Sequence, residues 1–171
     1  LDSDGDGCSD VIEAGFSDAN NDDLLGDNTV QVDAFGLVTN ASDGYTIPNV
    51  NYLISAPIVI TTEPEDTSVC ESSDIMISVV AADVNYYQWE VSIDGLNWNS
   101  VSDDVNYSGS TTSVLTIVNT TLLFNNYLYR VYLNRDGNSC GLYSQEITLT
   151  VDLLPIAEIA PTMQLCDDDN N

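Results

Sequence analysis

The opening segment LDSDGDGCSDVIEAG places carboxylates at alternate positions, a spacing that suits calcium binding. Calcium takes six to eight oxygen ligands, and alternate residues of a curled loop point their oxygens inward. The twelve-residue calcium loop D-x-[DN]-x-[DN]-G-x5-E fits here, with Gly7 at the sharp turn. A merely solvated acidic loop would not need this glycine or the final Glu, and magnesium suits an all-protein oxygen cage less well. The expected Ca2+ ligands are Asp2, Asp4, Asp6, the Cys8 carbonyl, Asp10 and Glu13.

A second and less regular loop follows in the stretch DANNDDLLGD. Its candidate ligands repeat the spacing of the first loop: Asp18, Asn20, Asp22 and the Leu24 carbonyl. Asp23 replaces the usual glycine, and position twelve holds no Glu. The alternative is an Asn/Asp turn held by its own side chains. The closing carboxylate of a metal site would be Asp27, Asp33 or Asp43, of which we include Asp33 in the candidate set.

The charge of the chain excludes several classes of function. Its 171 residues carry 28 acidic side chains, no His and only two basic residues, Arg130 and Arg135, for a net charge of −26. Nucleic acids and anionic membranes require cations, so neither is an expected partner, and no apolar run is long enough for membrane insertion. Most pairs of nucleophile and base cannot be assembled without His or Lys. We therefore expect no enzyme, and a glycosidase-like carboxylate pair cannot be told from calcium ligands.

The sequence divides into three parts of different composition and pattern. Residues 1–55 are rich in Asp, Asn and Gly, as expected of a loop-rich calcium-binding segment. Residues 56–152 show about seven short strands of alternating apolar residues, with Trp89 on the third. This pattern predicts an all-β fold, an immunoglobulin (Ig)-like antiparallel sandwich. Residues 153–171 read as a linker and the start of a further module, as if the chain were part of a longer one.

Both parts resemble known repeats. DSDGDGCSDVIEAG followed by DANNDD resembles calcium-binding repeats of the thrombospondin type 3 kind, in the versions found in giant surface proteins of Bacteroidota. The segments VCESSD, YYQWEVSIDGLNW, YLYRVYL and SCGLYSQEITLTV resemble Ig-like repeats of the same proteins. The resemblance implies secretion by the type IX route and a role in adhesion, gliding motility or an extracellular filament, without catalysis. Asp23 departs from the repeat pattern.

The four cysteines permit three complete pairings. An antibody-type bridge is not expected, because Ile77 and Tyr129 hold the inward positions of the second and sixth strands. Cys70 and Cys140 fall at opposite ends of such a sandwich, about 25–30 Å apart at about 3.3 Å per residue. A disulfide tolerates only about 7 Å between Cα atoms. The end that carries Cys140 faces the incoming chain, which holds Cys8, and the end that carries Cys70 faces the outgoing chain, which holds Cys166. We therefore favour Cys8–Cys140 and Cys70–Cys166, which would staple one module to the next. The alternative is Cys70–Cys140, with the other two paired outside this chain.

Taken together, the expected function is structural or adhesive. We expect an extracellular, cell-surface segment that calcium makes rigid, whose partners are neighbouring modules and, beyond them, surface glycans or other copies of the protein. The alternative is a carbohydrate-binding accessory module of a secreted enzyme, which a row of exposed, coplanar aromatic rings would favour. Trp89 is expected in the core. The candidates for exposed aromatic side chains are Trp98, Tyr86 and Tyr107.

Overall fold

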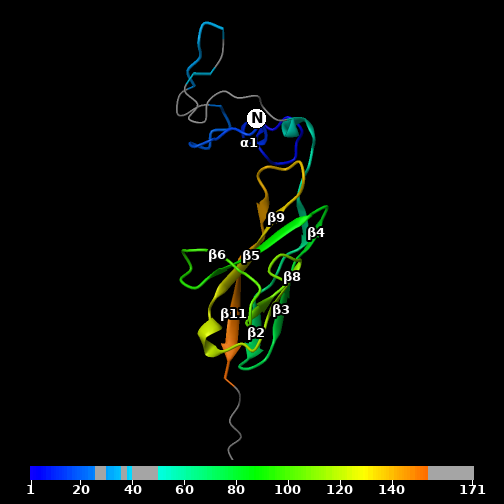
Figure 1. The fold of residues 1–171 in the computed structure, drawn as a ribbon, viewed down its shortest axis with the longest axis vertical. Coiled ribbons are helices and arrows are strands. Elements are labelled where there is room, and N and C mark those ends of the chain that lie inside the picture. The colour runs from blue at the N-terminus through cyan, green and yellow to red at the C-terminus, as the bar shows by residue number, and fades with distance from the viewer. Residues whose placement is uncertain (26–29, 36–37, 40–49, 154–171) are drawn as a thin grey trace, which may run out of the picture.

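The computed structural model describes residues 1–25, 30–35, 38–39 and 50–153. Figure 1 shows an elongated molecule with the acidic segment (the described residues 1–25, 30–35 and 38–39) at one end, the sandwich in the middle and the end of the last strand at the other end. The described helices of the acidic segment and of the connection that follows it are α1 (Asp10–Glu13) and η1 (Asn51–Leu53). None of the described helices is long and apolar enough to cross a membrane.

The alternating residues form strands because each strand buries one face. In β5 (Tyr86–Ser92) and β9 (Leu128–Asn134), which pair along their full lengths, Trp89, Tyr129 and Val131 are completely buried. The Trp89 indole N–H donates to the Thr112 carbonyl at 2.8 Å, so this core side chain leaves no polar group unpaired. The other buried apolar residues of the sandwich core are Ile77, Val79, Val101, Leu115, Ile117, Leu133, Ile147, Leu149 and Val151.

Two layers enclose this core. In the first, β1 (Val59–Thr62) pairs with β4 (Val80–Ala82), and β4 continues β3 (Ile75–Ser78) after a break at Val79. β3 pairs with β8 (Val114–Ile117), which pairs with β7 (Tyr107–Ser108). The second layer has the order β2–β11–β9–β5–β6, with β10 beside β9. Its remaining strands and the last helical turn are β2 (Thr67–Cys70), β6 (Asn99–Ser100), β10 (Leu142–Tyr143), β11 (Ile147–Asp152) and η2 (Leu122–Phe124).

The first edge of the sandwich belongs to both layers. The chain leaves the β1 layer at Pro64, which has no N–H for a ladder, and then forms β2 parallel to β11. A strand that crosses between the sheets in this way, together with the strand order of each sheet, defines an Ig-like sandwich. The predicted all-β, Ig-like fold is therefore confirmed. The short strands β2, β6, β7 and β10 were not foreseen, because segments of two to four mostly polar residues carry no clear alternation.

The described part of the acidic segment consists of loops and one short helix, α1. Helix α1 ends because Gly15 adopts φ +90° and donates to the Ile12 carbonyl, while the Phe16 N–H donates to the Val11 carbonyl. These two hydrogen bonds form a Schellman motif, which requires a residue with positive φ just after the helix. The turn fixes Glu13 at the end of α1. Farther along, Val32 and Val38 form an isolated antiparallel bridge.

Candidate metal centre

The first acidic loop has the backbone that the calcium pattern requires. The Asp2 carboxylate accepts hydrogen bonds from the N–H groups of Gly5 at 2.8 Å, Asp6 at 3.2 Å and Gly7 at 3.0 Å. Gly5 and Gly7 adopt φ of +75° and +91°, a region that other residues enter at a cost. Glycine at the sixth position is thus explained by the turn itself.

This turn gathers three carboxylates. Oxygens of Asp2, Asp4 and Asp6 all lie within 4.8 Å of one another, the one such group of three acidic side chains in the described part of the chain. Both oxygens of Asp4 are enclosed and have no hydrogen-bond partner. Burial, followed by the charge of Asp6, raises the pKa of Asp4. The loop therefore holds negative charge where water does not solvate it.

Glu13, at the end of helix α1, does not belong to the group formed by Asp2, Asp4 and Asp6, but it interacts electrostatically with all three. Its side chain has no exposed surface, and neither carboxylate oxygen has a hydrogen-bond partner. Burial raises its pKa to about 7, and the next contributions are the charges of Asp6, Asp4 and Asp2, in that order. A buried carboxylate facing other carboxylates is costly unless a cation or a proton neutralises it.

The unpaired atoms are concentrated in this one loop. Buried polar atoms nearly always have partners in folded proteins, so each exception requires an explanation. Within the described ranges, every buried side-chain nitrogen or oxygen without a partner belongs to Asp4, Ser9 or Glu13. The five unpaired oxygens all belong to residues 4–13, and carboxylate oxygens are the donors that hard cations such as calcium prefer.

Two of the predicted ligands have additional roles in the structure. Asp10 accepts hydrogen bonds from the Ser3 N–H at 2.7 Å and the Ser3 hydroxyl at 2.6 Å, which lower its pKa. Asp10 therefore closes the loop through its contacts with Ser3. It does not belong to the group formed by Asp2, Asp4 and Asp6. Cys8 is buried, and its N–H donates to Asp6 Oδ1 at 3.0 Å.

The second loop repeats the hydrogen bonds of the first. Asp18 accepts from the N–H groups of Asp22 at 3.1 Å and Asp23 at 2.9 Å, as Asp2 accepts from Asp6 and Gly7. Asp22 accepts from the Leu24 N–H at 2.9 Å, as Asp6 accepts from Cys8. Asp23 adopts φ +60°, so it takes the backbone shape that glycine provides in the first loop.

The second loop lacks an observed closing carboxylate. Its third position is Asn20, whose side-chain amide donates to Asp22 at 2.9 Å. Asp33 accepts from the Phe35 N–H at 2.8 Å within its own turn, and the structure does not place it in a group of three carboxylates. Asp27 and Asp43 lie outside the described residues. The loop geometry is therefore present, whereas its metal site stays a prediction.

A disulfide joins the acidic segment to the sandwich. It links Cys8 to Cys140 in the turn after β9, with 5.6 Å between the Cα atoms, and this is the first of the two bridges favoured from the sequence. Cys70, at the end of β2, is an exposed free thiol, so it is not joined to Cys140. Its favoured partner, Cys166, lies outside the described residues, and Cys70 forms no bridge within them.

The exposed aromatic side chains do not form a flat row. Arg130 lies between the rings of Trp98 and Tyr143, 4.1 Å from each centroid, and binds Glu90 at 2.9 Å. The Tyr132 and Tyr143 rings are tilted by 53°. The expected exposure of Tyr107 is wrong, because its hydroxyl lies 3.1 Å from that of buried Tyr129 inside the sandwich. This surface gives no support to the carbohydrate-binding alternative.

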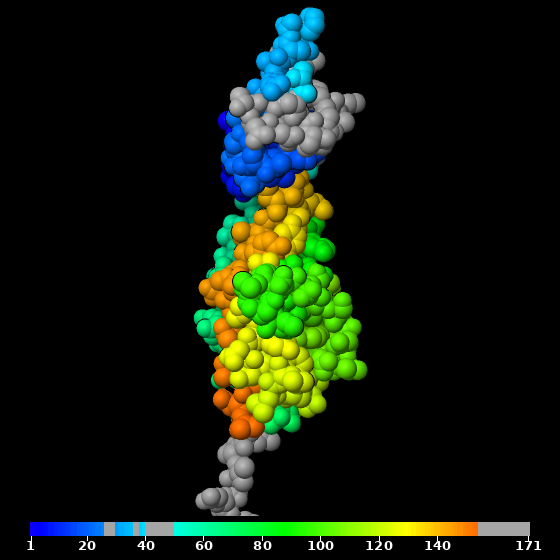
Figure 2. Space-filling view, turned by 90° about the vertical axis from the view of Figure 1, so that its left-hand side faces the viewer, coloured from blue at the N-terminus to red at the C-terminus, as the bar shows by residue number. Residues whose placement is uncertain are grey.

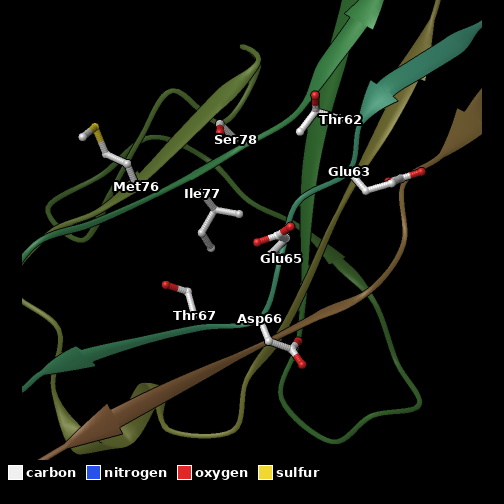
Figure 3. A pocket seen from close by; sticks show the side chains of 8 residues that line it. All are labelled: Thr62, Glu63, Glu65, Asp66, Thr67, Met76, Ile77 and Ser78. Carbon is white, nitrogen blue, oxygen red and sulfur yellow. The ribbon is translucent and has the colours of Figure 1, made fainter.

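A hollow lies beside the segment in which the chain crosses from β1 to β2, and its acidic side chains have structural roles (Figure 3). It lies between the segment that joins β1 to β2 and the edge of β3 that does not pair with β8. Two of its acidic side chains hold the β10–β11 region: Glu63 accepts from the Gln145 N–H at 3.0 Å and Asp66 from the Thr148 N–H at 2.7 Å. These two carboxylates hold the segment that joins β1 to β2 against β11 and the residues just before it. Within the described residues, the one group of three close carboxylates lies in the first acidic loop.

Comparison with known proteins adds a family for the sandwich. The model of a family described as "Domain of unknown function (DUF8696)" matches residues 59–153. The chain belongs to this family. The matched residues run from the start of β1 to just after β11, so the DUF8696 match covers the sandwich and not the acidic segment. No curated protein gives a match to the chain.

Solved structures similar to this DUF8696 member include Ig domains. "Crystal Structure of Duf (Kirre) D1" is 17% identical, with a TM-score of 0.46, and covers 57% of this chain and 99% of its own. "Tandem Ig repeats of Dlar" is 18% identical, with a TM-score of 0.46, and covers 57% of this chain and 49% of its own. An Ig domain in a titin M10–obscurin-like 1 complex is 12% identical, with a TM-score of 0.47, and covers 59% and 98%.

Proposed function

We propose that this chain is a structural module of an extracellular, cell-surface protein, and that calcium makes it rigid at the end where the acidic segment meets the Ig-like sandwich. The observation that carries the proposal is Glu13, a fully buried carboxylate whose oxygens have no hydrogen-bond partner and whose pKa is raised by burial and by the charges of Asp6, Asp4 and Asp2. A structure without a cation would need to protonate or expose this group, because a buried, unpaired charge is strongly unfavourable.

The donor set suits calcium better than other metals. The residues that would bind it are Asp2, Asp4, Asp6 and Glu13 through carboxylates, and Cys8 through its backbone carbonyl. These are hard oxygen donors, and Cys8 offers no thiolate because its sulfur is in the disulfide. Bound calcium supplies positive charge that neutralises the loop. The second loop, with its matching backbone, is a weaker candidate for the same ion.

The arrangement of the ends supports a mechanical role. The acidic segment lies at one end of the sandwich, and β11 leads to the opposite end (Figure 1). Tension applied between the two ends would pass through the Cys8–Cys140 bridge and through the parallel pairing of β2 with β11. Calcium would stabilise the loop that carries Cys8. Neighbouring modules are the expected partners, with surface glycans or other copies of the protein beyond them.

Thermal unfolding tests the calcium proposal. A ligand that binds only the folded state raises the melting temperature, so we expect a higher value in calcium than in EGTA. Glu13→Gln should remove most of this difference. The control is Glu65→Gln, an exposed carboxylate of the sandwich crossover, which should keep it. Equal melting temperatures of the unmodified protein in calcium and in EGTA would contradict the proposal.

A further inference from the structure

The Ig-like sandwich reaches into the candidate metal loop through Asn138. This residue lies in the turn after β9 and is 8% exposed. Its side-chain amide N–H group donates to the Ala56 carbonyl at 3.0 Å and lies 3.5 Å from Asp6 Oδ2. The Ala56 N–H donates to the same Asp6 oxygen at 2.9 Å. Asp6 is thus held by the sandwich turn and by the chain that leads into β1.

The other half of Asn138 anchors it to its own turn. Its side-chain oxygen accepts from the N–H groups of Cys140 at 3.0 Å and Gly141 at 2.8 Å. The same turn therefore fixes both Cys140, which is bonded to Cys8, and the amide that faces Asp6. Figure 2 shows the acidic segment, in blue, lying directly on the orange turn region at that end of the sandwich.

These contacts place two of the five proposed calcium ligands under the control of the sandwich. Asp6 Oδ1 accepts from the Cys8 N–H at 3.0 Å, so the carboxylate and the disulfide are linked through one short segment. Partners that hold a metal ligand in place raise metal affinity, and their loss commonly weakens binding by about 10- to 100-fold. We propose that Asn138 is a positioning residue for the calcium site, and that calcium binding and docking of the acidic segment onto the sandwich stabilise each other. This inference rests on the proposed calcium binding.

Coupling between calcium binding and docking of the acidic segment must act in both directions. If docking raises calcium affinity, calcium must favour docking by the same factor. Opening of the joint exposes the Cys8 sulfur, which belongs to a residue only 1% exposed when docked, and makes the half-buried Cys140 more accessible to a reductant. Calcium should therefore slow the reduction of the Cys8–Cys140 bridge, although neither sulfur binds the ion.

The first test measures calcium affinity on the full chain by isothermal titration calorimetry. Asn138→Ala should bind calcium about 10-fold more weakly than the unmodified protein. The matched control is Asn125→Ala, which removes a side chain that also anchors a turn, through the Val151 N–H at 2.9 Å, far along the chain from Asp6. This control should keep its affinity. An unchanged affinity for Asn138→Ala would overturn the coupling while leaving calcium binding intact, whereas no binding to the unmodified protein would overturn both proposals.

The second test needs no Asn138 variant, so it still tests the coupling between calcium binding and docking if Asn138→Ala does not fold. Reduction of the bridge by dithiothreitol is followed by alkylation and mass spectrometry of the Cys8 and Cys140 peptides, in calcium and in EGTA. Calcium should slow the reaction several-fold in the unmodified protein and have no effect in Glu13→Gln. A rate that calcium does not change, in protein that binds calcium by calorimetry, would contradict the coupling.

Discussion

The Cα atoms of Cys8 and Cys140 lie 5.6 Å apart, although 132 positions separate the two residues in the sequence. The bridge joins the middle of an acidic loop to a turn of the sandwich. Because Asp6 contacts the same turn and Ala56, the loop and the sandwich share one joint. Removing the bridge should therefore affect the docking of the loop more than the core around Trp89.

Replacing both cysteines, as Cys8→Ser with Cys140→Ser, should lower the free energy of unfolding by about 2–4 kcal/mol, because the unfolded chain regains the freedom of a long loop. Urea unfolding in EGTA, followed by circular dichroism, measures the change. Cys70→Ser is the control for the loss of a cysteine outside this bridge, since Cys70 is exposed and forms no bridge within the described residues, and it should lower the free energy of unfolding by less. Identical unfolding curves for the double variant and the unmodified protein would contradict a structural role for the bridge.

Calcium binding near pH 7 should release protons. The metal-free folded protein holds a proton on Glu13 up to a pKa of about 7, which lies above its ordinary value of 4.5. Without metal, this group therefore favours folding increasingly as the pH falls from above 7 toward 4.5. Calcium needs the deprotonated carboxylate, so binding at pH 7 should release about half a proton per ion from this group, and affinity should fall at lower pH.

Calorimetric titrations in buffers of different ionisation enthalpy measure this proton release. Glu13→Gln has no proton to lose at this position, so any ion that it still binds should be accompanied by less release. A proton count that is the same in both proteins would show that Glu13 is not the group that titrates.

Asp94 should stabilise the turn after β5 in a manner that depends on pH. Its carboxylate accepts from the Asn97 N–H at 2.8 Å, the Asn97 amide at 2.7 Å and the Leu96 N–H at 2.9 Å, and these hydrogen bonds hold its pKa well below the ordinary 3.8. The stabilisation is complete above about pH 4 and is lost as the pH falls through the lowered pKa. Asp94→Ala should melt at a lower temperature than the unmodified protein at pH 6, and the gap should narrow at pH 2.

Melting curves at both pH values check this prediction. Asp83→Ala serves as a comparison for the loss of one negative charge, since Asp83 is also an exposed turn residue of the sandwich. Asp83 has a positive φ, so alanine at this position also introduces backbone strain. The two variants are therefore distinguished by how the lowering of the melting temperature depends on pH, and not by its size. A gap for Asp94→Ala that does not change between pH 6 and pH 2 would contradict the prediction.

Trp89→Ala should cost about 3–5 kcal/mol of unfolding free energy, because it leaves a large cavity and removes the donor to the Thr112 carbonyl. Chemical unfolding followed by circular dichroism measures the loss. Trp98→Ala, which removes a half-buried ring over Arg130, should cost less. A larger loss for Trp98→Ala would show that the Arg130 stack, and not the Trp89 core, holds the sandwich together.

The fold and the first loop could be predicted because their residues follow strict local rules. Alternation around Trp89 and Tyr129 identifies strands with one buried face, and the positive φ of Gly7 follows from the calcium-loop pattern. The favoured Cys8–Cys140 pairing came from the placement of both residues near one end of the expected sandwich. Of these predictions, only the cysteine pairing needed the order of the strands.

Other features depend on contacts that no local pattern encodes. The parallel pairing of β2 with β11 follows from the crossover at Pro64, and β2 itself is short and half polar. Asn138 looks like an ordinary turn residue in Asp136-Gly137-Asn138, so its contact with Asp6 is visible only once the two parts are docked. The pairing of Asp10 with Ser3, rather than with the carboxylate group, also depends on how tightly the loop closes.

The most direct test of the central claim is a crystal structure grown with calcium, with anomalous data to identify the ion. We expect one strong peak among Asp2, Asp4, Asp6 and Glu13, with carboxylate oxygens about 2.3–2.6 Å from the ion and the Cys8 carbonyl among the ligands. A peak at this position would also show why Glu13 is buried without a partner. Absence of a peak there, with Glu13 hydrogen-bonded to water or turned to the solvent, would contradict calcium binding by the first acidic loop.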